Sequence, residues 1–210
     1  MRIRQILATV AAAGLLLVGL PTAAQADTIV KYGNYTVPAG RTIDDDLTVR
    51  NGTLIIYGTV DGNVRQTGNG SIRIMSGGHV DGNVVETGNG DLRIAGSVDG
   101  NVTETGNGYI RITGRVDGNV EERQAGDLRI ARGAKIDGNV TERSGGSLRI
   151  AGRIDGNAAE ADGGHLLLYA TARIDGNVKE YGNGNLYVYR GAKVEGEIKE
   201  YGSGSRINRR

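Results

Sequence analysis

The chain of 210 residues has no cysteine, tryptophan or phenylalanine, and only two prolines and two methionines. Without cysteine it can form neither a disulfide framework nor a thiolate metal site, so its stability must come from packing and hydrogen bonding. The scarcity of aromatic residues is unusual for a conventional globular core. These absences point to an interior built from small and aliphatic side chains.

A strong charge of one sign is also missing. The chain has 25 basic and 24 acidic residues, and two of the arginines lie within residues 1–26. The remainder holds 23 basic and 24 acidic residues, which gives a net charge of −1. A near-neutral chain offers no argument for bulk binding to nucleic acid or to an anionic membrane.

Residues 1–26 are typical of a secretory signal peptide. Arg2 and Arg4 form the basic start, Ile6 to Leu20 form the apolar region, and Ala24-Gln25-Ala26 is a small-residue cleavage site. We therefore predict export, to the periplasm or the extracellular space, and a mature chain without a membrane span. No cysteine follows the apolar region, so an anchor attached to cysteine is excluded.

Glycine is abundant, with 36 residues, and one glycine stands at the centre of a five-residue phrase that is repeated along the chain. The phrase is Val-Asp-Gly-Asn-Val at residues 60–64, and it returns after every 18 or 20 residues. A fixed period of this size is typical of a solenoid, in which each repeat stacks on the one before it. The later copies begin at Val80, Val98, Val116, Ile136, Ile154 and Ile174.

The coil that begins at Val98 shows strand periodicity. Gly100 and Val102 continue the inward set begun by Val98, and Ile110 and Ile112 alternate in the same way after a Gly-Asn-Gly corner. No apolar stripe with helical spacing occurs after residue 26. Hairpins turning at Asp-Gly are the alternative, and the lack of aromatic cross-strand pairs argues against them. We predict an all-β, single-stranded parallel β-helix (a β-solenoid) of about 8–9 coils with 18–20 residues each.

The difference in coil length falls at a single corner. Short coils pass it through segments such as Ala95-Gly96-Ser97, and long coils through segments such as Ala131–Lys135. An insertion of two residues at a corner preserves which side chains face inward. On this basis residues 27–42 are expected to form an N-terminal cap, residues 43–200 the repeat domain, and residues 201–210 a C-terminal cap or basic tail.

The repeat resembles the bactofilins, which are polymer-forming cytoskeletal proteins. The segment Arg132-Gly133-Ala134-Lys135-Ile136-Asp137-Gly138-Asn139-Val140 is the closest local match, and the resemblance extends over residues 43–200. It implies a right-handed parallel β-helix that polymerises end to end through apolar terminal coils without nucleotide. Bactofilins are typically cytoplasmic, whereas this chain carries an export signal, so a cytoskeletal role rests on analogy alone.

The repeated phrase predicts two outward ladders. Stacked asparagine amides can hydrogen-bond along the rod, whereas stacked carboxylates repel one another and invite Ca²⁺ or a basic counter-ladder. We expect a solvated, arginine-balanced face and keep Ca²⁺ as the alternative; no other cofactor is expected. The ladders are Asp61, Asp81, Asp99, Asp117, Asp137, Asp155 and Asp175, and Asn63, Asn83, Asn101, Asn119, Asn139, Asn157 and Asn177.

A basic ladder and a second acidic column also recur. We expect their charges to compensate one another along a solvated face. The functional alternative is a comb of guanidinium groups for an anionic or carbohydrate polymer of the cell envelope. The basic ladder is Arg73, Arg93, Arg111, Arg129 and Arg149, and the acidic column is Glu86, Glu104, Glu122, Glu142, Glu160, Glu180 and Glu200.

Near both ends of the repeat, apolar and aromatic residues replace the outward arginines. Such residues suggest contact sites, and the alternative is that they pack beneath the terminal segments. They are Ile55, Tyr57, Leu167, Tyr169, Tyr187 and Tyr189.

No arrangement of catalytic residues is apparent. His79 and His165 lie about four coils apart, roughly 20 Å at strand spacing, so they share neither a metal nor a proton relay. We therefore predict no catalytic residue and no metal ligand. The preferred interpretation is an exported, self-associating structural protein of the cell envelope. A binding module that uses the arginine ladder is the alternative, and a polysaccharide-active enzyme comes third.

Overall fold

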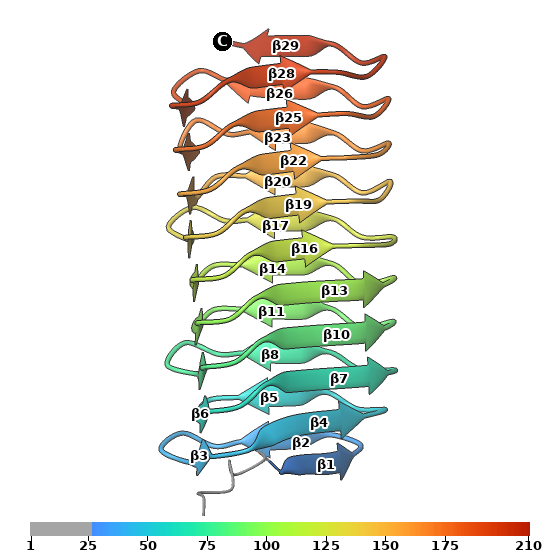
Figure 1. The fold of residues 1–210 in the computed structure, drawn as a ribbon, viewed down its shortest axis with the longest axis vertical. Coiled ribbons are helices and arrows are strands. Elements are labelled where there is room, and N and C mark those ends of the chain that lie inside the picture. The colour runs from blue at the N-terminus through green and yellow to red at the C-terminus, as the bar shows by residue number, and fades with distance from the viewer. Residues whose placement is uncertain (1–26) are drawn as a thin grey trace, which may run out of the picture.

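A computed structural model describes residues 27–210; the predicted signal peptide lies outside these residues. The described chain consists of 29 β-strands joined by bends and turns, and it contains no helix. The strands form three parallel sheets that run along an elongated rod (Figure 1). Each turn of the rod contributes one strand to each sheet, except that the last turn has no strand in the third sheet, so the predicted parallel β-solenoid is confirmed.

Sheets A and B have ten strands each, and sheet C has nine shorter ones. Sheet A contains β1 (Thr28–Tyr32), β4 (Asp46–Arg50), β7 (Val64–Gly68), β10 (Val84–Gly88), β13 (Val102–Gly106), β16 (Val120–Glu122), β19 (Val140–Glu142), β22 (Ala158–Glu160), β25 (Val178–Glu180) and β28 (Ile198–Glu200). Sheet B contains β2 (Tyr35–Val37), β5 (Leu54–Ile56), β8 (Ile72–Ile74), β11 (Leu92–Ile94), β14 (Ile110–Ile112), β17 (Leu128–Ile130), β20 (Leu148–Ile150), β23 (Leu166–Leu168), β26 (Leu186–Tyr189) and β29 (Arg206–Arg209). Sheet C contains β3 (Thr42–Ile43), β6 (Thr59–Val60), β9 (His79–Val80), β12 (Ser97–Val98), β15 (Arg115–Val116), β18 (Lys135–Ile136), β21 (Arg153–Ile154), β24 (Arg173–Ile174) and β27 (Lys193–Val194).

The rod has about ten turns, slightly more than the 8–9 predicted. The first turn includes β1 and β2, which pair with β4 and β5, and the last strand, β29, pairs with β26. In Figure 1 the chain rises from β1 to β29 while sheet A runs to the right in front and sheet B returns behind, which makes the coil right-handed.

Each coil has three strands, because the repeated phrase forms a corner and not the middle of one strand. In the coil at Val98, β12 ends at Val98 and β13 begins at Val102, with a bend at Asp99 and Gly100. A Cβ added to Gly100 would lie 2.5 Å from the carbonyl oxygen of Gly82 in the preceding coil. The glycine therefore allows successive corners to stack closely, and the expectation of one continuous strand through the phrase was wrong.

The two-residue insertions lie at the corner between sheets B and C, as predicted. Gly77, Gly133 and Gly191 have φ values of 86°, 86° and 103° in three of these longer corners. Glycine adopts this left-handed region without the steric cost that a side chain brings. The corner therefore absorbs two residues while the inward set of the next strand is unchanged.

Aliphatic side chains from all three sheets fill the interior. One coil contributes Val98, Val102, Ile110 and Ile112, each with 0% exposure. Burial on this scale stabilises the rod by about 25 cal/mol for each Å² of apolar surface removed from water. Because each coil covers its neighbours, the interior is one continuous apolar cluster along the rod.

The asparagine ladder forms the predicted chain of hydrogen bonds. Asn119 donates its backbone N–H and its side-chain amide to Oδ1 of Asn101, at 2.9 and 3.1 Å. Asn139 makes the same pair of bonds to Asn119, at 2.8 and 3.0 Å. Asp46 takes the asparagine's place at the start of the ladder and accepts both bonds from Asn63. These bonds fix the register of successive coils.

The acidic column of the repeat is buried, which corrects the expectation of a solvated face. Six of its seven glutamates, from Glu86 to Glu180, have 0% exposure. The reason is the alternation within sheet A: Val102 points inward, Thr103 points outward, and Glu104 therefore points inward again. A row of carboxyl groups thus lies beside the aliphatic core.

Candidate functional site

Most of the residues predicted to form surface contacts belong to one column on the outer face of sheet B. Strand pairing places each one directly beside the next, from β5 to β26. In order along the rod the column is Ile55, Arg73, Arg93, Arg111, Arg129, Arg149, Leu167 and Tyr187. We call its five arginines the arginine comb.

Two members of the comb are paired with carboxylates. Arg93 Nη2 lies 2.9 Å from Asp91 Oδ2, and Arg149 Nη1 lies 2.5 Å from Asp127 Oδ2. The guanidinium carbon of Arg93 also lies 4.9 Å from the centre of the Tyr109 ring. By contrast, Arg73, Arg111 and Arg129 form no ion pair with any residue among 27–210. Their charges are available to an external anion.

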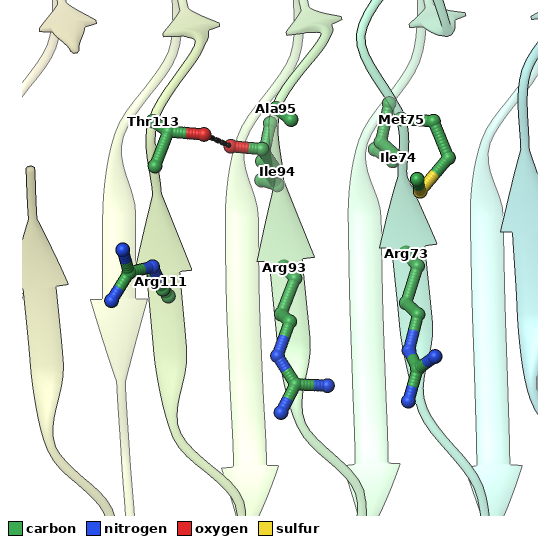
Figure 2. Close-up of a pocket in the computed structure, with 8 residues that line it drawn as sticks. All are labelled: Arg73, Ile74, Met75, Arg93, Ile94, Ala95, Arg111 and Thr113. Carbon is green, nitrogen blue, oxygen red and sulfur yellow. Dashed lines mark hydrogen bonds between the residues drawn. The ribbon is translucent and has the colours of Figure 1, made fainter. Parts of the chain in front are cut away.

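A shallow depression lies along the N-terminal part of the comb. Figure 2 shows Arg73, Arg93 and Arg111 on the successive strands β8, β11 and β14. Met75 and Thr113 lie at the other end of the depression, where the Thr113 hydroxyl donates to the carbonyl oxygen of Ile94 at 3.3 Å. The depression has a volume of about 420 Å³ and is lined by Arg73, Ile74, Met75, Arg93, Ile94, Ala95, Arg111 and Thr113. It offers guanidinium groups beside a small apolar floor.

The aromatic residues predicted near the C-terminal end form stacks between successive coils. The rings of Tyr169 and Tyr189 lie 5.3 Å apart between centres, with 27° between their planes. Tyr187 contacts His165 edge to face at 5.5 Å, and the guanidinium carbon of Arg209 lies 5.0 Å from its ring centre. Near the other end Tyr57 is 42% exposed. The structure therefore brings the C-terminal aromatics together and leaves Tyr57 apart from them.

The aspartate ladder has the expected basic balance, but it is supplied by a column whose residues sequence analysis did not identify. Arg115 pairs with Asp117 and Asp137, and Arg153 pairs with Asp155 and Asp175. Between them Lys135 lies 2.7 Å from Asp137 and 3.4 Å from Asp155. These contacts hold the pKa of Asp155 below its usual value, against the opposing effect of partial burial. The signal was present in the sequence, since a basic residue stands two positions before the aspartate in these coils.

In earlier coils the basic column is interrupted, and a histidine takes one of its places. His79 Nε2 contacts Asp81 Oδ1 and lies 3.9 Å from Asp99 Oδ2, while its Nδ1 lies 2.8 Å from the Ser97 hydroxyl. Imidazole and carboxylate groups are ligands that divalent metals accept, and these three residues are the cluster among residues 27–210 that could hold such an ion. A protonated His79 would balance the same carboxylates. Sequence analysis weighed His79 only against His165 and so missed the aspartate of the next coil.

The apolar interior is incompletely covered at both ends of the rod. Ile29 and Tyr35 in the first coil, and Val188, Val194 and Ile198 towards the last, are partly exposed although they pack on the core. The strands at these ends also carry hydrogen-bonding groups that pair with no further strand among the described residues. Open edges of this kind can add another strand.

Comparison with known proteins agrees with this architecture. Residues 103–199 match the family described as Bactofilin: Polymer-forming cytoskeletal, which confirms the resemblance over these residues. The coils before residue 103 lie outside the match, although they continue the same three sheets. No curated protein and no solved structure matches the chain. Within residues 27–210 there is no helix with the length and apolar character needed to cross a membrane.

Proposed function

From the bactofilin match over residues 103–199 we propose that this chain is an exported structural protein that self-associates through the ends of its rod. The observation that carries the proposal is the incompletely covered interior of the terminal coils. A second rod stacked on such an end would bury Ile29 or Ile198 and pair the open strands. We assign the chain a structural role, without catalysis.

Export is proposed from the first 26 residues, which have the organisation of a signal peptide. It places the rod in the cell envelope or outside the cell. The absence of cysteine suits a rod that is held together by stacking rather than by disulfides. Association through strand edges also requires no nucleotide, so it can proceed outside the cytoplasm.

Self-association is tested by light scattering and electron microscopy of the purified protein at rising concentration. We expect filaments, and we expect Ile29→Lys to raise the concentration needed for assembly by roughly 10- to 100-fold. The reason is that burying an isoleucine contributes about 1.5–3 kcal/mol, and each 1.4 kcal/mol corresponds to a factor of ten.

The matched control is Val30→Lys, because Val30 lies on the same strand and faces outward with 40% exposure. It should leave assembly unchanged. A protein that stays monomeric at every concentration would contradict the proposed function. Equal effects of Ile29→Lys and Val30→Lys would contradict the assignment of the junction to the inward face of β1.

The arginine comb supports a second candidate function, the binding of an anionic envelope polymer. The specific observation is that Arg73, Arg111 and Arg129 are aligned on one face and have no carboxylate partner among the described residues. Guanidinium groups repeated at strand spacing suit a linear polyanion, since each group can contact a different charged unit.

For this second function we expect the triple change of Arg73, Arg111 and Arg129 to glutamine to abolish retention on an immobilised acidic polysaccharide. In the control variant, glutamine replaces three arginines that are already paired with carboxylates, so the same charge is removed. These arginines are Arg115, Arg123 and Arg153. Retention is measured as the salt concentration at elution, because exposed charge pairs weaken with ionic strength. Equal losses in both variants would show that net charge, not the comb, controls retention.

A further inference from the structure

Sheet A carries a continuous column of inward polar side chains. Strand pairing places Gln66, Glu86, Glu104, Glu122, Glu142, Glu160, Glu180 and Glu200 one above the other. Successive members are separated by one strand spacing, about 4.8 Å. From Gln66 to Glu180 all have 0% exposure, and only Glu200, in the last coil, is half-buried.

From Glu104 to Glu200, the first carboxyl oxygen of each glutamate has a hydrogen-bond partner at the neighbouring corner. Glu122 Oε1 accepts the backbone N–H of Gln124 at 3.0 Å, and Glu160 Oε1 accepts that of Gly164 at 3.0 Å. Glu180 makes the equivalent contact with Gly182 at 3.1 Å. One oxygen of each side chain is thereby fixed at the sharp turn that leads from sheet A to sheet B.

In most of these glutamates the second oxygen is buried without such a partner; in Glu122, Oε2 accepts a hydrogen bond from the Ser144 hydroxyl at 2.9 Å. In Glu104, Glu142, Glu160 and Glu180 it is Oε2 that has no hydrogen-bond donor, and in Glu86 neither oxygen has one. An ionised carboxylate in this position would lack both water and a donor, which is costly in an apolar interior. An added proton removes the charge and supplies an O–H that a neighbouring carboxyl can accept.

Basic groups that could neutralise the column are absent from its surroundings among the described residues. The inward residues of sheets B and C that face it are aliphatic, such as Leu92, Ile112 and Val116. Asp91 is a further acid that acts on Glu86. Of the basic residues, Lys31 lies at the N-terminal end of the column, beyond Val49 and Gln66, and Arg206 lies in the last strand, β29. Neither lies beside the central glutamates.

Burial accordingly raises the pKa of several column members. The pKa of Glu86 is raised to about 7, and those of Glu104 and Glu180 to about 9, with loss of hydration as the largest cause. The pKa of Glu142 is raised to about 10 for the same reason. Glu104, Glu142 and Glu180 are every second member of the column. A protonated acid at these places has a carboxyl group on either side that can accept its hydrogen bond.

We propose that the interior of sheet A is a proton-binding site: at neutral pH the glutamate column takes up protons as the chain folds and shares them between adjacent coils. Each uptake converts one carboxylate into a carboxylic acid by forming an O–H bond, with solvent as the proton source. The proposal is independent of polymerisation, because all of the groups lie within one rod. It explains how a row of acids can occupy the core without a basic counterpart.

Proton release on unfolding tests the proposal directly. Calorimetric unfolding of the purified protein at pH 7, in buffers with different ionisation enthalpies, gives the number of protons exchanged. We expect release of about three protons per chain, one for each of Glu104, Glu142 and Glu180, with a further fraction from Glu86. The double variant Glu104→Gln, Glu142→Gln should release about two fewer.

Glutamine is a conservative replacement here, since Gln66 already occupies the column and its amide donates to the carbonyl oxygen of Gly52 at 3.3 Å. The control is Glu121→Gln, which removes an outward carboxylate from the same strand as Glu122 and should leave the release unchanged. No proton release from the parent protein would overturn the proposal. Release that is insensitive to the double variant would overturn it as well. Stabilisation by an added metal cation, without proton release, would assign the column to that cation instead.

Discussion

Alanine in place of Gly146 is expected to lower the melting temperature by about 10 °C or more. A Cβ at this position would lie 1.7 Å from the carbonyl oxygen of Gly126 and 2.5 Å from its carbonyl carbon. Both atoms belong to the backbone of the preceding coil, so neither can move aside without breaking the stack. A clash of this kind costs about 4 kcal/mol or more, and each kcal/mol lowers the melting temperature of a chain of this size by about 2–4 °C.

The adjacent Gly145 provides the matched control. A Cβ added to Gly145 would meet no atom within 4 Å, and its φ lies outside the left-handed region. We expect Gly145→Ala to change the free energy of unfolding by less than about 0.5 kcal/mol. Thermal unfolding of both variants, followed by circular dichroism, makes the comparison. Equal melting temperatures for the two variants would contradict the close stacking of the corners.

The corner that contains Gly146 recurs in the other coils, so the same destabilisation is expected for alanine at the equivalent glycines. A Cβ on Gly164 or Gly184 would lie 1.4 Å from the carbonyl oxygen of the glycine one coil earlier. Glycine is therefore required at this corner by the distance between coils, not by flexibility. In the Gly-Asn-Gly segments both glycines carry this requirement, for example Gly106 and Gly108, each with a Cβ position 1.7 Å from a carbonyl oxygen. In Gly145-Gly146 only the second glycine does, so the expected contrast between these two variants isolates the effect of close stacking.

Stability is expected to decrease as pH rises from about 5 to about 9. The unfolded chain ionises glutamate near pH 4.5, whereas Glu104, Glu142 and Glu180 in the folded chain retain their protons to about pH 9 or 10. Between these pH values the folded state binds more protons than the unfolded state, so the free energy of unfolding decreases as the pH rises. The stabilisation from these three glutamates is fully present below about pH 4.5 and is lost as the pH rises through their raised pKa values.

The surface ion pairs have the opposite dependence. Arg123 and Arg143 hold the pKa of Glu121 below its usual value, and Lys135 and Arg153 do the same for Asp155, although partial burial opposes the shift in both cases. These pairs stabilise the fold above the ordinary carboxyl pKa and are lost as the pH falls below it. Both acid and alkali should therefore destabilise the rod, with greatest stability in the mildly acidic range.

A melting-temperature profile against pH tests this balance. We expect the melting temperature to fall by about 10 °C for each pH unit near pH 7, because release of about three protons corresponds to about 4 kcal/mol per pH unit. Glu104→Gln should raise the melting temperature at pH 8 by several degrees and leave it nearly unchanged at pH 5. The reason is that glutamine cannot ionise, so the unfolded chain no longer gains stability from ionisation at this position as the pH rises. Glu121→Gln should not flatten the alkaline side of the profile. A profile that rises towards pH 9 would contradict a neutralised column.

The repeat alone was sufficient to predict the solenoid, because side chains alternate along each strand and coils of equal register must stack. The Val, Leu and Ile positions identified the core, and the asparagines identified the hydrogen-bonded ladder. The same alternation, continued two residues beyond Val102, would have placed Glu104 inside. Because an acidic side chain is ordinarily solvent-exposed, its charge favours the surface, and in this fold the periodicity prevails over that preference.

Other features depend on contacts between coils that no single repeat contains. His79 meets Asp99 only because β9 and β12 are adjacent in sheet C. Arg115 and Arg153 balance the aspartates because each bridges two successive coils. The arginine comb was visible as a periodic set, whereas the lack of partners for Arg73, Arg111 and Arg129 followed from the positions of the neighbouring carboxylates.

The sequence by itself determined the repeat length, the strand periodicity and the identity of each column, since these follow from spacing along the chain. The tertiary structure decided which columns are buried and which charges are paired, because both depend on how three sheets close around one interior. It also decided that the repeated phrase is a corner, where the coil bends between sheets C and A and glycine lets successive turns approach. The closure that buries the valines also buries the glutamates.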